Sequence, residues 1–139
     1  MYFHNDRPNP NSTDTITNLS YLSTYKSYKE LLPTYKSKYA NGLPEIKALE
    51  AEEDMDNFFI EYIDKGVKDL NDFSAILLDE LKKGGRFKLT VQGFASPLAA
   101  TDYNVNLTKR RISSYMNYLK EYKKGVFLPY LSGKAPNGG

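Results

Sequence analysis

The stretch VQGFASPLAATDYNVNLTKRRISSYMNYL, residues 91–119, decides how this chain is organised. Around its start, Phe87, Leu89 and Val91 alternate with polar residues, and this period of two predicts a half-buried strand. Gly93 follows directly and permits a tight turn. The beginning of the stretch is therefore expected to be the end of a strand.

A loop and an amphipathic helix are expected next. Residues 94–101 are mostly small, and Pro97 stiffens them into a short loop. From about Asp102 the apolar residues change to the three-four spacing of one helix face. That face is made of Tyr103, Leu107, Ile112, Tyr115, Leu119 and Tyr122.

Arg111 is the most informative residue of this helix. It lies four residues after Leu107 and four before Tyr115, so its side chain is expected in the apolar stripe, whereas Arg110 is expected to point toward water. An unpaired buried charge is costly, and a pocket between loop and helix would let Arg111 hold a carboxylate through two hydrogen bonds. Alternatively, Arg111 pairs with an acid of this protein or extends to the surface.

The residues of this stretch resemble the signature of the OmpA-family peptidoglycan-binding domain, which also occurs in flagellar motor stators. The matching residues are Gly93, Tyr103, Asn104, Leu107, Thr108, Arg110, Arg111, Tyr118 and Leu119, and they fit without a gap. The form GFASP at residues 93–97 is similar to a subgroup of large envelope proteins, some of them associated with type IX secretion.

The resemblance implies a fold. It implies an α+β sandwich with a βαβα core, in which helices cover a small mixed sheet and residues 2–4 form the first strand. Residues 20–83 exceed what this core needs, so a helical insertion is expected between the first two strands. The C-terminal strands are expected to be missing. We expect one domain over residues 1–139, excised from the C-terminal part of a larger exported envelope protein.

The resemblance also implies a ligand and a location. Domains of this family bind the diaminopimelate of the peptidoglycan stem peptide without catalysis, and so anchor outer-membrane or periplasmic complexes to the cell wall. Arg111 would hold a carboxylate of diaminopimelate, and Asn104 would help line the site. The other expected site residues are Asn5, Asp6, Ala95, Ser96, Pro97 and Leu98. Peptidoglycan and other envelope proteins are the expected partners, in the periplasm.

Ser96 departs from the family pattern, which has an aspartate three residues after the glycine to meet the ligand's ammonium group. A serine hydroxyl carries no charge, and the lost hydrogen bond to a charged group is worth roughly 1.5–3 kcal/mol. Asp6 or Asp102 could substitute for it. The alternative function is a structural or protein-interaction domain of an envelope complex that kept the fold and lost the ligand.

Composition favours binding over catalysis. The chain has no cysteine and a single histidine, His4, so neither thiolate chemistry nor a His/Cys metal site is expected. The sequence has no glycine-rich phosphate loop and no GxSxG motif. We therefore expect neither an enzyme nor a cofactor. A net charge of +2 gives no argument for nucleic acid, and no apolar run is long enough to span a membrane.

Two further helical segments are expected before the central stretch. Residues 20–40 show helical spacing, interrupted at Pro33, and residues 54–83 form a long stripe that should pack on one face of the sheet. Tyrosines alternate with lysines in the first of these. This pattern could indicate a stacking surface for single-stranded nucleic acid, but we favour packing of the tyrosines on the core.

Overall fold

The structure is a computed structural model that describes residues 1–96 and 99–139, and every regular element in these residues is helical. The α-helices are α1 (Tyr21–Glu30), α2 (Leu32–Ala40), α3 (Glu45–Phe58), α4 (Lys65–Lys82), α5 (Thr101–Glu121) and α6 (Leu128–Leu131). A π-helical turn, η1 (Phe59–Asp64), joins α3 to α4, and a 3₁₀ turn, η2 (Tyr122–Lys124), follows α5. The expected α+β sandwich is wrong, because the described residues contain no strand.

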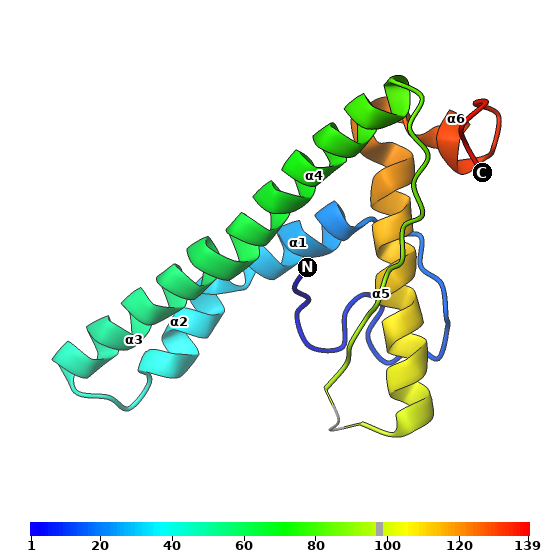
Figure 1. Ribbon diagram of the computed structural model, residues 1–139. Helices are drawn as coiled ribbons and strands as arrows, with labels where there is room; N and C mark the ends of the chain where they lie inside the picture. Colours follow the sequence, from blue (N-terminus) through cyan, green and yellow to red (C-terminus); the bar gives the residue numbers. More distant parts are fainter. Residues whose placement is uncertain (97–98) are drawn as a thin grey trace.

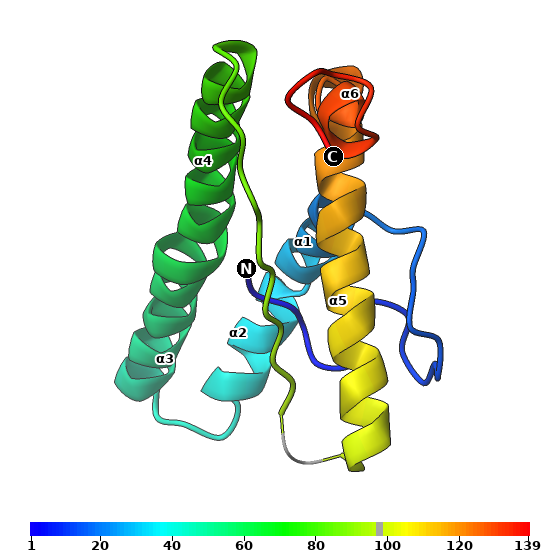
Figure 2. The same cartoon turned by 45° about the vertical axis from the view of Figure 1, so that its right-hand side comes forward.

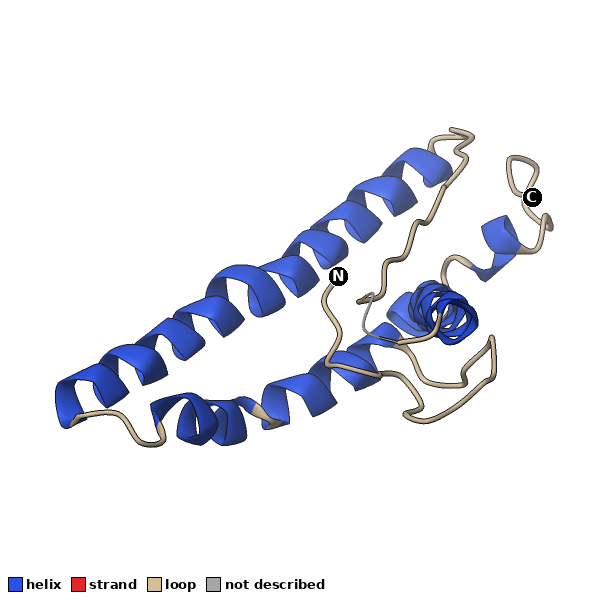
Figure 3. Ribbon diagram, turned by 90° about the horizontal axis from the view of Figure 1, so that it is seen from below, coloured by secondary structure: helices blue, strands red, loops and turns tan. Residues whose placement is uncertain are grey.

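The helices form two long arms and a crossing helix (Figure 1). α3, η1 and α4 make one continuous rod, and α2 packs against α3 as the chain returns along it. α5 crosses the other arm at α1. Seen from below, the turn between α2 and α3 closes one end of the two arms (Figure 3). None of the described helices is both long enough and apolar enough to span a membrane.

Local signals explain where the first helices begin and end. The Ser20 side chain caps α1 by accepting a hydrogen bond from the Ser23 amide, at 3.4 Å. The expected interruption before Pro33 is confirmed, since α1 ends at Glu30 and Pro33 lies in the first turn of α2. The helix expected over residues 54–83 is also confirmed, but the helical run begins earlier, at Glu45, because the charged residues that follow Pro44 form the first turns of α3.

The two expected strands remain extended without pairing. Residues 86–92 run between α4 and α5 with no strand beside them (Figure 2). At the N-terminus the Tyr2 backbone pairs with the hydroxyl of Tyr21, which accepts from the Tyr2 amide at 3.1 Å and donates to the Tyr2 carbonyl at 3.4 Å. An alternating sequence favours extended backbone, but a sheet also needs a second extended segment at ladder distance.

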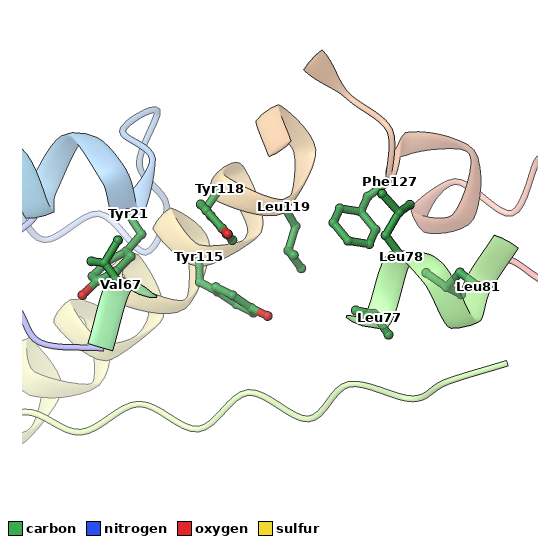
Figure 4. Close-up of a cluster of buried hydrophobic side chains, with 9 residues drawn as sticks. All are labelled: Tyr21, Val67, Leu77, Leu78, Leu81, Tyr115, Tyr118, Leu119 and Phe127. Atoms are coloured by element: carbon green, nitrogen blue, oxygen red, sulfur yellow. The ribbon is translucent and has the colours of Figure 1, made fainter. Parts of the chain in front are cut away.

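The main core lies where α4 meets α1 and α5 (Figure 4). It consists of Tyr21, Val67, Leu77, Leu78, Leu81, Tyr115, Tyr118, Leu119 and Phe127. The apolar stripe of α4 therefore packs against other helices and not on a sheet face. Tyr118 is held by hydrogen bonds at both sides of its hydroxyl, with Ser74 at 3.1 Å and Asn71 at 2.8 Å.

Candidate functional site

A hollow of about 840 Å³ lies between the start of α5 and the parts of the two arms formed by α1, α2 and α3. One side of it is polar and is lined by Asn5, Asp6, Asn11, Ser96, Asn104 and Arg111. The opposite side is aromatic and includes Tyr28, Tyr35, Tyr39, Phe58 and Phe59. A hollow of this size with convergent polar groups is typical of sites that bind small ligands or short peptides.

Arg111 reaches the hollow from the middle of α5 and is half-buried. Its Nε donates to the Arg7 carbonyl at 3.0 Å, and Nη1 donates to the Phe94 carbonyl at 2.7 Å. The guanidinium also lies 5.0 Å from the centre of the Phe3 ring, a cation–π contact. Within the described residues it forms no ion pair, so its charge is oriented by carbonyls but not neutralised by a carboxylate.

The environment of Arg111 raises the cost of its charge. Burial lowers the pKa of Arg111, and the neighbouring charge of Arg110 lowers it further, whereas Asp6 acts in the opposite direction. A guanidinium nevertheless stays protonated in proteins. Arg111 is therefore a fixed cation whose charge would be better compensated if an anion entered the hollow.

Arg110 does not point toward water, contrary to expectation. Its side chain is completely buried, with Nε donating to the Pro8 carbonyl at 3.1 Å and Nη1 donating to the carbonyls of Ser12, at 2.8 Å, and Asp14, at 2.7 Å. The buried Nη2 has no partner within the described residues. The loop between residue 5 and α1 folds over this face of α5, so Arg110 fixes the loop that carries Asp6.

Asp6 lies at the polar side of the hollow, where it contacts Tyr103, which is 97 positions away in the sequence. Its carboxylate accepts hydrogen bonds from the Tyr103 hydroxyl and, at 2.9 Å, from the Asn11 amide. Burial alone would raise the pKa of Asp6, but these hydrogen bonds and the charges of Arg110 and Arg7 outweigh it, and the pKa lies below its ordinary value. Asp6 is therefore an anion at neutral pH.

The structure brings five of the expected site residues together and leaves the others apart or undescribed. Arg111, Asn104, Ser96, Asp6 and Asn5 all line the hollow. Asn104 donates to the Ala99 carbonyl at 3.1 Å, which ties the end of the loop to α5. Ala95 is half-buried and does not line the hollow, and Asp102 is exposed away from it. Pro97 and Leu98 lie outside the described residues.

Gly93 serves a different purpose from the expected tight turn. A Cβ atom at this position would lie 2.7 Å from Thr108 Cγ2 and 3.4 Å from the Thr108 carbonyl oxygen. The absence of a side chain therefore lets the extended segment approach α5 closely. This approach places the next residue, Phe94, where its carbonyl accepts the hydrogen bond from Arg111.

Sequence reasoning missed the aromatic side of the hollow. Tyr28, Tyr35 and Phe59 contact one another, with ring centres 5.2–6.2 Å apart, and the Tyr35 hydroxyl hydrogen-bonds His4 Nδ1. The three-four spacing of the tyrosines indicated that they share a face of their helices, which is correct. It contained no signal that this face would lie opposite Arg111, because that depends on how the arms fold together.

The described residues contain no group of three or more histidine, aspartate or glutamate side chains that could hold a metal ion. Comparisons of the chain with protein-family models, with curated proteins and with solved structures gave no match.

Proposed function

We propose that this chain is a non-catalytic module that binds the diaminopimelate residue of the peptidoglycan stem peptide in the hollow beside α5, and so anchors an envelope complex to the cell wall. The resemblance of residues 93–119 to the OmpA-family signature suggests this ligand. The observation that carries the proposal is the presence of Arg111 and Asp6 on one hollow, a cation and an anion that are not paired with each other.

Diaminopimelate suits this pair because its distal end carries both an ammonium group and a carboxylate on one carbon. Arg111 would receive the carboxylate, since a guanidinium can offer two parallel N–H groups to its oxygens. Asp6 would receive the ammonium and so replace the charge that Ser96 lacks. A carboxylate has about four acceptor positions, and Asp6 uses two of them for Tyr103 and Asn11.

A matched pair of ligands tests the assignment of Arg111. A stem peptide that contains lysine in place of diaminopimelate lacks the distal carboxylate and otherwise keeps the same side chain. We expect wild-type protein to bind the diaminopimelate peptide about ten- to a hundredfold more tightly, as measured by calorimetry, because a hydrogen bond to a charged group is lost. Arg111→Lys should abolish this preference.

Two further variants complete the test: Lys109→Ala is a control for the loss of positive charge, and Asp6→Asn tests the contact with the ammonium group. Lys109→Ala removes an equal charge from an exposed position on the same helix and should leave binding unchanged. Asp6→Asn should weaken binding of both peptides, because both carry the ammonium group. Equal affinity of wild-type protein for the two peptides, or an Arg111→Lys variant that still prefers diaminopimelate, would refute the proposal.

A second candidate function is a structural or protein-interaction domain that does not bind peptidoglycan. It is favoured by the commitment of Arg111 to two backbone carbonyls, and by the uncharged Ser96. In that case Arg111 only holds the loop and the extended segment against α5. A titration with a muropeptide followed by NMR would then shift none of the signals of Arg111, Asn104 or Asp6.

A further inference from the structure

The extended segment 86–92 has a backbone without hydrogen-bond partners. No amide or carbonyl group of these seven residues is bonded to another described residue. The carbonyl of the preceding residue, Gly85, accepts from Asn137 at 2.7 Å, and that of Phe94 accepts from Arg111. An extended backbone with free donors and acceptors is the element to which a further strand can add.

Apolar side chains of this segment border an open hollow of about 510 Å³. Phe87, Leu89 and Val91 line it together with core residues of α4 and α5, among them Leu77 and Tyr115. Phe87 and Leu89 are 51% and 42% exposed, so the hollow leaves a substantial apolar area in contact with water. Figure 4 shows the segment passing beside the core side chains. A partner that pairs with the segment could therefore also cover the core.

Most residues that line this hollow come from the C-terminal part of the chain, and that part is strongly basic in composition. Residues 84–139 contain nine lysines and arginines but only two acidic residues. Residues 1–83 contain ten lysines and arginines and fifteen acidic residues. Exposed basic residues lie within the segment and at the ends of the helices that precede and follow it in the core, α4 and α5–η2: Lys82, Arg86, Lys88, Lys120, Lys123 and Lys124. None of the six forms an ion pair with a described residue, and Arg86 only donates to the Pro136 carbonyl, at 2.9 Å.

We propose that residues 86–92 form a docking edge for an extended strand of a partner protein, one whose apolar residues alternate with acidic residues. The free backbone groups would pair with its main chain, the hollow would receive its apolar side chains, and the basic residues would meet its acidic ones. A second copy of this chain fits less well, because its own segment 86–92 contains no acidic residue to meet Arg86 and Lys88. This surface is distinct from the hollow beside Arg111.

Short synthetic peptides test the proposal on the whole chain. The probe alternates valine with glutamate, and its control alternates valine with lysine. We expect the acidic probe to bind at least about tenfold more tightly by fluorescence anisotropy, with an affinity that falls as salt is added. Hydrogen exchange should slow at the amides of residues 86–92 when the acidic probe is present.

Two variants separate backbone pairing from charge. Thr90→Pro removes one amide from an exposed position in the segment, and Lys88→Glu reverses one charge; each should weaken binding of the acidic probe while the helical circular dichroism is kept. The proposal is overturned if both peptides bind equally, if the amides of 86–92 stay unprotected, or if neither peptide binds. Self-association of the chain through this segment, or preferential binding of anionic lipid vesicles there, would equally overturn it in favour of those occupants.

Discussion

Tyr103, in the first turn of α5, donates a hydrogen bond to the carboxylate of Asp6, in the loop that follows the N-terminal segment. This contact joins two parts of the chain that are 97 positions apart and places an anion at the edge of the hollow that Arg111 enters. Asp6 has a φ angle of 55°, in the left-handed region that aspartate tolerates better than most residues. Backbone and side chain therefore both depend on residue 6 being aspartate or a close mimic.

Removal of the Tyr103 hydroxyl should change the titration of Asp6. Among the causes that keep the pKa of Asp6 low, the hydrogen bond from Tyr103 is the strongest, so Tyr103→Phe should raise this pKa toward its ordinary value. The measurement is an NMR titration of the Asp6 carboxyl carbon. Tyr130→Phe, which removes a hydroxyl far from Asp6, is the control. An unchanged Asp6 titration in Tyr103→Phe would show that the hydrogen bond does not form in solution.

Replacement of Arg110 should destabilise the protein strongly. Arg110→Leu removes three hydrogen bonds from a fully buried guanidinium and leaves the carbonyls of Pro8, Ser12 and Asp14 without their donor. We expect the free energy of unfolding to fall by at least about 3 kcal/mol, because each hydrogen bond to a charged group is worth roughly 1.5–3 kcal/mol. Urea denaturation measures it.

The neighbouring exposed residue provides the comparison for Arg110. Lys109→Ala should change the free energy of unfolding by no more than about 0.5 kcal/mol, as is usual for surface positions. If the two variants have similar stability, the buried position of Arg110 is wrong, and with it the fixed path of the loop that carries Asp6.

Sequence patterns predicted the helices well because helices are local. The three-four spacing, Pro33 and the small-residue loop before α5 all act within a few residues, and the observed helices follow them. The direction of Arg111 was also predictable from its register with Leu107. The burial of Arg110 was not, because a position 100° from the stripe faces water only if no distant segment covers it. Here the loop of residues 8–14 covers it.

The absence of the expected sheet was not predictable, for a related reason. Alternation in residues 86–92 specifies an extended backbone, and the structure has one. Pairing is a property of two segments, and the sequence of one segment does not show whether the second lies beside it. The N-terminal residues, expected as the first strand of the sheet, instead bond to Tyr21 and contact aromatic side chains of the helices.

Replacement of Gly93 and of Gly66 by alanine should change the stability of the protein in opposite directions, because the two glycines have different surroundings. Gly93→Ala would place a methyl group 2.7 Å from Thr108 Cγ2, so either this side chain or the extended segment must move, at a cost of about 1–3 kcal/mol in unfolding free energy. Gly66→Ala, inside α4, would meet only Tyr2 at an ordinary 3.8 Å and should stabilise the protein by about 0.5–1 kcal/mol. Thermal or urea unfolding of both variants gives the two signs, and a stabilising Gly93→Ala would contradict the close approach to α5.

Acid should reduce stability in two separable steps, the first of which comes from His4. Burial and the charge of Arg7 lower the pKa of His4 from its ordinary 6.5. Between the folded pKa of His4 and 6.5, the unfolded chain therefore binds more protons than the folded chain. The stability of the folded protein is therefore unaffected by His4 above pH 6.5 and falls as the pH drops from 6.5 toward the folded pKa. The variant His4→Gln should lack this step in urea denaturation measured across the pH range.

The second step comes from Asp6, whose pKa lies below its ordinary 3.8 in the folded protein. A carboxylate with a lowered pKa contributes stability above its unfolded value, and this contribution is lost as the pH falls from 3.8 through the folded pKa. The difference in unfolding free energy between wild-type protein and Asp6→Asn should therefore be constant at neutral pH and shrink only below about 4. A difference that already shrinks near pH 6 would mean that Asp6 titrates higher, and that the hydrogen bonds from Tyr103 and Asn11 do not hold it as an anion.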